Sequence, residues 1–141
     1  MDHCVFCHIL AGKADASIIY RDERCCAFLD LFPANEGHVL VIPVKHAATV
    51  SELDQETCGH IFRVGMKVAE ALRQSTVPCD AVNFHLADGS AAGQEIFHVH
   101  LHVIPRIEGD GFGFKFARGR ARRREREELD VTADKIRSTL M

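Results

Sequence analysis

Short apolar runs separated by turn residues occur along most of the chain and predict a sheet of short strands. The runs at 18–20 and 25–29 flank the charged residues 21–24, a pattern typical of a β-hairpin. Strands joined by such a short connection pair antiparallel, so we expect an antiparallel sheet. Further β-rich runs lie at 38–42, 81–86 and 96–104.

One longer segment has a helical repeat instead. Between Ser51 and Gln74, apolar residues recur at spacings of three and four, which predicts one amphipathic helix of about five turns. Ser51 or Asp54 can cap its first turn. A short terminal helix is predicted at 127–140. One long helix packed on one face of an antiparallel sheet makes an α+β domain.

Length and composition indicate one domain. The chain has 141 residues, of which 47% are hydrophobic, so it can bury a core of its own. We expect no membrane span, since no apolar run approaches ~18 residues, and no secretory signal at Met1-Asp2-His3-Cys4. We therefore expect a cytoplasmic protein without a membrane partner, whose six cysteines are buried or bind metal rather than form disulfides.

Charge is distributed unevenly along the chain. Residues 1–114 hold 8 basic and 15 acidic side chains, a net of −7, whereas residues 115–141 hold 9 and 5, a net of +4. We therefore divide the chain into a domain at 1–116 and an arginine-rich segment at 117–141, whose short helix packs on or extends the same domain. Such a basic run can attract nucleic acid. Acidic residues follow it closely, so a solvated face is favoured and nucleic acid is not an expected partner.

The run at 98–102, which reads His-Val-His-Leu-His, carries the candidate chemistry. Side chains alternate between the two faces of a strand, so the three histidines share one face. They could form an exposed polar row, a metal site, or a catalytic site, since a neutral imidazole is a nucleophile toward phosphorus. The opposite face is expected to enter the core with Phe97, Val99, Leu101 and Val103.

This histidine run, with Ala-Gly-Gln at 92–94, resembles the signature of the histidine triad (HIT) family. The resemblance extends over residues 4–116 and includes the segments 28–30, 37–43 and Asp88-Gly89. It implies a HIT-like fold and a homodimer whose strands continue across the two subunits. The features that resemble the bacterial-type branch of the family are Cys4-x-x-Cys7, Lys45-His46 and Pro105-Arg106.

The resemblance implies a role for each matching residue. His100 would attack the α-phosphorus, His102 would contact the phosphate and assist the leaving group, and His38 would line the phosphate site. Gln94 would contact the region of the scissile bridge. Gly93 would let the backbone pass close to a phosphate, with its N–H donating to a non-bridging oxygen. The other nucleotide contacts would be Asp30 for the ribose and Phe6, Ile9, Phe28 and Leu31 for the base.

The expected activity is hydrolysis or transfer at the α-phosphate of nucleoside phosphoramidates or dinucleoside polyphosphates. It would pass through a covalent nucleotidyl-histidine and release a nucleoside monophosphate, without a catalytic cofactor. The alternative is a regulatory protein that binds nucleotides with little turnover. Two residues depart from the family pattern: Ala87, where Asn or Gln is frequent, and Glu95, where Ser or Thr is frequent. A carboxylate at 95 could hold an amine or repel an anion, which places phosphoramidates slightly ahead.

Cys4 and Cys7 form a Cys-x-x-Cys pair without the βαβ context of a redox motif. They could be two ordinary buried cysteines, or half of a tetrahedral zinc site. The resemblance to the bacterial-type branch implies a structural zinc with Cys4, Cys7, His46 and His98 as ligands, which would fix the strand beside His100. The remaining cysteines, Cys25, Cys26, Cys58 and Cys79, are expected to fill core space, and His3, His8, His60 and His85 have no assigned role.

Overall fold

The computed structural model describes residues 3–113 and 122–140 of the chain. Residues up to Asp110 form one compact unit and residues from Gly111 onward form a second one, so each is described by itself. The boundary predicted between residues 116 and 117 lies outside the described residues. Among the helices described, none is both long enough and apolar enough to cross a membrane.

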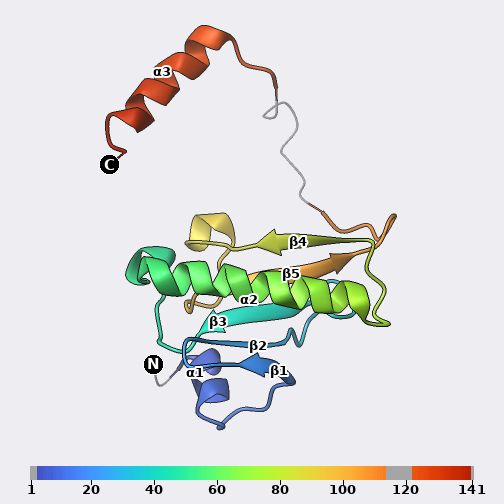
Figure 1. Cartoon of the computed structure of the whole chain (residues 1–141). Coiled ribbons are helices and arrows are strands. Elements are labelled where there is room, and N and C mark those ends of the chain that lie inside the picture. Colours follow the sequence, from blue (N-terminus) through green and yellow to red (C-terminus); the bar gives the residue numbers. More distant parts are fainter. Residues whose placement is uncertain (1–2, 114–121, 141) are drawn as a thin grey trace. The chain divides into compact units, whose positions relative to one another are not determined.

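The first unit is built on one antiparallel sheet, as the sequence predicted (Figure 1). Its strands are β1 (Ile18–Arg21), β2 (Cys25–Leu29), β3 (Val39–Pro43), β4 (Ala81–His85) and β5 (Leu101–Arg106). They lie in the order β1-β2-β3-β5-β4, and every neighbouring pair is antiparallel. The predicted hairpin is β1–β2, and the two edges of the sheet are β1 and β4.

The long helix α2 (Gln55–Gln74) crosses one face of this sheet (Figure 1). A 3-10 turn, η1 (Val50–Glu52), precedes it, and Asp54 caps it by accepting a hydrogen bond from the Thr57 N–H at 2.8 Å. The helix approaches β5 closely at Gly65. The main core contains Ile61, Val64, Val68 and Leu72 of the helix with Val41, Leu101 and Val103 of the sheet.

The opposite face of the sheet is covered by α1 (Val5–Leu10), a short helix where the sequence indicated only a short mixed segment. Neighbouring residues of β2 enter different cores: Cys25 packs on the α2 side and Cys26 on the α1 side. Because both faces of β2 and β3 are buried, these strands have continuous apolar sequences instead of alternating ones. The core under α1 contains Phe6, Ile9, Cys26, Phe28, Leu40 and Ile42.

The strand predicted at 96–104 is wrong in its first half, because β5 begins only at Leu101. The preceding backbone is bonded to a loop instead of a strand: the Val99 N–H donates to the Ala47 carbonyl at 2.8 Å. Phe97, which was expected in the core, has 45% of its surface exposed. The other apolar residues of that predicted face, Val99, Leu101 and Val103, are buried as expected.

Asp22 links the β1–β2 hairpin to α2. Its Oδ2 accepts hydrogen bonds from the Tyr20 hydroxyl at 2.7 Å and from His60 Nε2 at 2.6 Å. Cys25 and Cys26 are fully buried, and burial raises the pKa of the Cys25 thiol to about 12. Of the four remaining cysteines, which were expected to fill core space, Cys79 is half-buried and packs against the main core, whereas Cys58 is half-buried and lies outside both core clusters.

The second unit contains the helix α3 (Arg126–Arg137), close to the predicted span of 127–140. A reciprocal capping box between Glu125 and Glu128 begins it. The helix has no buried residue, and Arg122, Arg123 and Arg124 before it are exposed. Arg118 and Arg120 of the arginine-rich segment lie outside the described residues.

Candidate functional site

Three histidines, His38, His100 and His102, meet where β3 and β5 pair. His38 immediately precedes β3, and His102 lies opposite Leu40 in the β3–β5 register. His38 Nε2 is 2.9 Å from His102 Nδ1, and the rings of His100 and His102 are 4.9 Å apart. His38, His98 and His100 are buried and His102 is half-buried. The structure therefore brings the three predicted phosphate-site histidines together.

The hydrogen bond of His100 defines its tautomer. Its Nδ1 lies 2.8 Å from the carbonyl oxygen of His98, and because a carbonyl only accepts, Nδ1 carries the proton. In the neutral ring, Nε2 then has the free lone pair. Burial lowers the pKa of His100, which favours this neutral form. Nε2 of His100 therefore has the free lone pair that the predicted nucleophile requires.

A chain of hydrogen bonds likewise orients His102. The Ala34 N–H donates to His38 Nδ1 at 3.0 Å, so the proton of neutral His38 is on Nε2. That proton points to His102 Nδ1, which leaves His102 with its own proton on Nε2. Burial and the neighbouring imidazoles lower the pKa of His102 to about 4. Burial also lowers the pKa of His38. The Asp30 carboxylate, 3.5 Å from His38 Nε2, opposes that lowering.

Gln94 is buried and its side chain is bonded to the backbone. Its Oε1 accepts from the Gly89 N–H at 2.7 Å, and its Nε2 donates to the carbonyls of Ala48 at 2.7 Å and Ile96 at 3.1 Å. Both amide hydrogens of Gln94 are thus engaged in holding the loop before the histidines. Its predicted contact with the scissile bridge stays a prediction.

Gly93 ends the 3-10 turn η2 (Ser90–Ala92) in the left-handed conformation, with φ of 89°. Its N–H donates to the Ser90 carbonyl at 3.0 Å. The expected donation from this N–H to a phosphate oxygen therefore does not fit the arrangement seen. A Cβ on Gly93 would meet no atom within 4 Å, so the backbone conformation and not crowding requires glycine here.

The predicted base contacts separate into two groups. Phe6, Ile9 and Phe28 are buried together, and the Phe6 ring packs edge-on against the rings of Phe28 at 5.5 Å and His100 at 5.3 Å. Leu31, in contrast, is 85% exposed and lies outside this cluster. The structure therefore groups three of the four apolar residues, and one of them, Phe6, lies against the His100 ring.

His85 is a site residue that the sequence analysis missed. It lies directly opposite His102 in the β4–β5 register, and the two rings are 5.4 Å apart. A positive charge on His85 contributes to lowering the pKa of His102. The sequence alone could not place His85 beside His102, because that requires knowing that β4 pairs with β5 and in which register.

Cys4, Cys7, His46 and His98 form a second cluster, in which all four ligand atoms lie within 4.8 Å of one another. His98 Nδ1 is 3.4 Å from Cys4 Sγ and 3.2 Å from His46 Nδ1, and Cys7 Sγ is 3.3 Å from His46 Nδ1. Ligands about 2.0–2.3 Å from a tetrahedral zinc are separated by roughly 3.3–3.8 Å, so this donor set fits zinc. His98 Nε2 donates to the Pro43 carbonyl at 2.8 Å, which leaves its Nδ1 free to bind metal.

The chain is similar in sequence to proteins of one family. The family model of the HIT domain matches residues 11–109. A HIT-like protein of Methanocaldococcus jannaschii is 45% identical over 108 residues, which are 76% of this chain and 81% of that protein. The adenylylsulfatase HINT3 of Arabidopsis thaliana is 36% identical over 107 residues, or 76% of this chain and 54% of that protein.

Solved structures of the same family have the same fold. A HIT family protein from Bacillus anthracis superposes with a TM-score of 0.87 at 37% identity, covering 99% of both chains. A Zn-bound histidine triad family protein from Mycobacterium smegmatis does so with a TM-score of 0.77, also at 37% identity and 99% of both chains.

Proposed function

Because the chain belongs to the histidine triad (HIT) family and has its α+β fold, we propose that it is a nucleotide hydrolase or transferase acting through a covalent nucleotidyl-His100. The substrates are nucleoside phosphoramidates or dinucleoside polyphosphates, cleaved at the α-phosphate. One observation carries this proposal: the bond from His100 Nδ1 to the His98 carbonyl leaves the neutral imidazole with a free lone pair on Nε2. The relative named as an adenylylsulfatase and the HIT family hydrolase of Legionella pneumophila support hydrolysis as the reaction class.

In the first step, His100 Nε2 attacks the α-phosphorus and forms a P–N bond, while the bond to the leaving group breaks with its electron pair. The Nε2–H of neutral His102 donates a hydrogen bond to the leaving group, which takes up a proton from the solvent as it departs. The nucleotidyl imidazole keeps its Nδ1 proton and is positively charged, and the His98 carbonyl stabilises that charge by accepting the hydrogen bond.

In the second step, water attacks the same phosphorus and the P–N bond breaks. The attacking water releases one proton to the solvent, and the electron pair of the P–N bond returns to His100 Nε2, which regains its neutral form as the nucleoside monophosphate leaves. The Ala34–His38–His102 chain keeps the donor on His102 in the same tautomer for both steps. No step needs a metal, because each electron pair moves between imidazole, water and substrate, and each proton is exchanged with the solvent.

The nucleoside half of the substrate has complementary surfaces nearby. We propose that the base packs on the cluster of Phe6, Ile9 and Phe28, and that the Asp30 carboxylate accepts hydrogen bonds from the ribose hydroxyls. The Asp30 Oδ1 is held by the Phe32 N–H at 2.9 Å, while its Oδ2 faces His38. Leu31 would have to close over the base from its exposed position, and Gly93 and Gln94 would shape the loop at the phosphate.

We propose that Cys4, Cys7, His46 and His98 hold a structural zinc ion. Two thiolates and two imidazoles complete a tetrahedral shell, so no coordination position remains for water or substrate. The zinc-bound relative from Mycobacterium smegmatis supports this assignment. Zinc would fix His98, whose carbonyl orients His100. Free thiols of this kind persist in a reducing compartment, so we propose that the protein acts in the cytoplasm.

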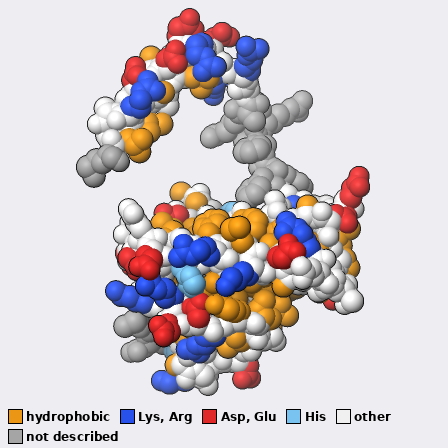
Figure 2. Space-filling view, viewed as in Figure 1, with side chains coloured by type: hydrophobic (Ala, Val, Ile, Leu, Met, Phe, Trp, Pro, Cys, Tyr) orange, Lys and Arg blue, Asp and Glu red, His pale blue; other side chains and the backbone are white. Residues whose placement is uncertain are grey.

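We propose that two copies of the chain associate through the β4 edge of the sheet. β4 is an unpaired edge within the described unit, and Phe84 on it lies near Phe62 of α2, with ring centroids 6.5 Å apart. Phe62, Met66 and Phe84 are all exposed, and Figure 2 shows hydrophobic side chains gathered on this side of the molecule. Pairing of two β4 strands would satisfy the edge and cover this patch.

The test is hydrolysis of adenosine 5′-phosphoramidate, diadenosine tetraphosphate and adenosine 5′-phosphosulfate by the wild type, His100→Ala and the control His8→Ala. We expect the wild type and the control to release AMP with or without a chelator. His100→Ala should lose about 10³-fold or more, because the nucleophile is gone. AMP binding without useful turnover would favour the regulatory alternative, and full activity of His100→Ala would contradict the proposal.

A further inference from the structure

An amine leaving group needs a proton to depart, and three imidazoles of the site cannot bring it. His38 Nε2 donates to His102 Nδ1 at 2.9 Å, so a second proton placed on His102 Nδ1 would face this one. Neutral His102 cannot give up its remaining proton without becoming an anion. His100 Nδ1 is bonded to the His98 carbonyl, and its Nε2 is the atom that attacks phosphorus in the proposed first step.

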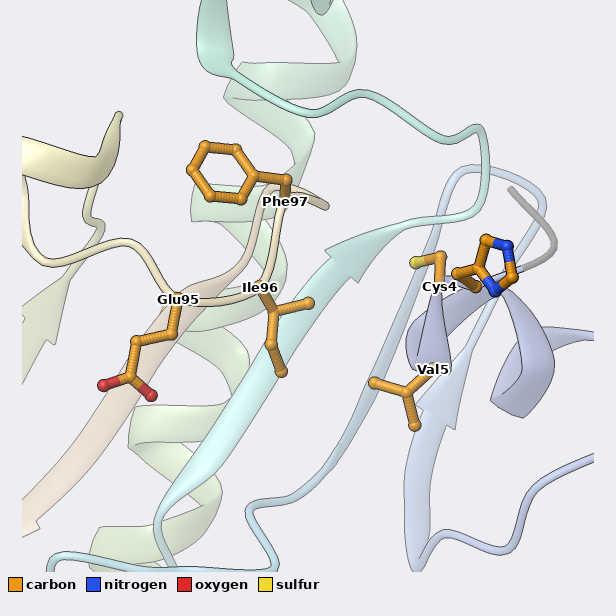
Figure 3. A pocket seen from close by; sticks show the side chains of 6 residues that line it. Cys4, Val5, Glu95, Ile96 and Phe97 are labelled. Atoms are coloured by element: carbon orange, nitrogen blue, oxygen red, sulfur yellow. The ribbon is translucent and has the colours of Figure 1, made fainter.

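Glu95 is the carboxylate that the sequence connected with an amine leaving group, but the structure gives it other neighbours. It lines a cavity of about 330 Å³ between the segment before β5 and the start of α1 (Figure 3). The other lining residues are His3, Cys4, Val5, Ile96 and Phe97, and none of the three phosphate-site histidines is among them. Glu95 is therefore not placed to give a proton to a group that leaves the α-phosphorus.

His85 is the fourth imidazole of the site, and it comes from the neighbouring strand. It ends β4 and lies directly opposite His102 in the β4–β5 register, so both side chains are on the same face of the sheet. The ring centroids of His85 and His102 are 5.4 Å apart, and those of His102 and His100 are 4.9 Å apart. A charge on His85 lowers the pKa of both His100 and His102, which places it close to both rings.

The surroundings of His85 suit a group that carries and exchanges a proton. Its ring is half-buried, whereas His100 is buried, so His85 can take up protons from the solvent. Burial lowers the pKa of His100 and His102 and keeps both rings neutral, so they do not repel a proton on His85. The negative α-phosphate of a bound substrate favours the protonated form of an imidazole beside it.

The charged side chains around β4 are engaged with other groups. Asn83, two residues before His85 on the same face, accepts a hydrogen bond from Arg106. Arg106 in turn forms an ion pair with Asp110 at 2.6 Å. Asp88, after the end of β4, accepts a hydrogen bond from the Val50 N–H at 2.8 Å. The substrate therefore supplies the charge that His85 meets in the reaction.

We propose that His85 is a further catalytic residue, the general acid that protonates the leaving group in the first step. The inference rests on the proposed hydrolysis at the α-phosphate through His100. As His100 Nε2 bonds to phosphorus, the electron pair of the bond that breaks goes to the leaving atom, which takes the proton of the His85 imidazolium. His85 is left neutral and regains a proton from the solvent before the next turnover.

The test compares two derivatives of AMP that differ in their need for a proton. The amine of the butylamidate departs only with a proton, whereas the 4-nitrophenyl ester releases a stable anion. The quantity measured is the ratio of kcat/KM for the ester to that for the butylamidate. The variants are His85→Gln and, as a second replacement, His85→Asn. The matched control is His8→Gln, at a half-buried histidine of α1 without a role in the reaction.

We expect both His85 variants to lose about 10²-fold or more in kcat/KM for the butylamidate and to stay within about threefold of the wild type for the ester. His8→Gln should keep the wild-type values. Both substrates are measured on one preparation, so a smaller folded fraction leaves the ratio unchanged. A ratio equal to that of the wild type overturns the inference while hydrolysis through His100 stands. A wild type that releases AMP from neither substrate overturns the proposed function and the inference together.

Discussion

Replacing glycine by alanine should change the stability of the fold differently at two positions of α2. The difference tests how the helix packs on the strand that carries His102. At Gly59, an added Cβ would contact only the flexible end of Arg63, with Nη1 at 3.5 Å. At Gly65, it would lie 2.9 Å from Cδ2 of Leu101, a fully buried residue of β5. The first position has room for a methyl group, and the second has none unless the core moves.

The expected magnitudes follow from these contacts. Alanine is favoured over glycine inside a helix by about 1 kcal/mol, so Gly59→Ala should raise the free energy of unfolding by up to that amount. Gly65→Ala gains the same term but overpacks the core, which costs about 1–3 kcal/mol. The net change should therefore be neutral to destabilising, and Gly65→Ala should be less stable than Gly59→Ala by about 1–3 kcal/mol.

Urea unfolding followed by circular dichroism measures both free energies under one condition. Equal stabilisation by the two substitutions would refute the close packing of α2 on β5. Unchanged slopes with denaturant would show that the two variants differ in stability and not in the extent of unfolding.

Three further predictions concern the site and its supports. The folded pKa of His102 is about 4 against an ordinary 6.5, so the unfolded chain takes up this proton first as the pH falls. The free energy of unfolding should therefore drop by up to about 3 kcal/mol between pH 6.5 and 4. Measured as a function of pH, it should fall less steeply in His102→Gln than in the wild type, and equal slopes for the two proteins would contradict the prediction. Cys7→Ser should lose bound zinc in a colorimetric metal assay and unfold at a lower temperature, whereas Cys79→Ser should keep both. Phe84→Glu should convert a dimer to a monomer in light scattering, and a wild-type monomer would exclude the proposed interface.

The sequence predicted the sheet and the long helix because each follows from local pattern, whereas the cluster of Cys4, Cys7, His46 and His98 was expected only from the resemblance to the HIT family. The hairpin and the strand at Val39–Pro43 have strong apolar runs. Asp54 is a standard capping residue, and the structure uses it as one.

What the sequence could not predict depends on contacts between distant segments. The start of β5 is delayed because Val99 bonds to the loop at Ala47, and no local pattern shows that contact. His85 joins the site only through strand register, and Gln94 uses its amide on the backbone at Ala48. The helix at Val5–Leu10 is too short for its periodicity to be recognised.

The central claim is that His100 carries the nucleotidyl group, and intact-protein mass spectrometry after rapid alkaline quench tests it most directly. Wild-type protein mixed with an adenosine 5′-phosphoramidate should gain the mass of one adenylyl group within the first turnover, and peptide mapping should locate it at His100. His100→Ala should gain none and release no AMP. AMP released by His100→Ala, or an adduct that maps to another residue, would contradict the account.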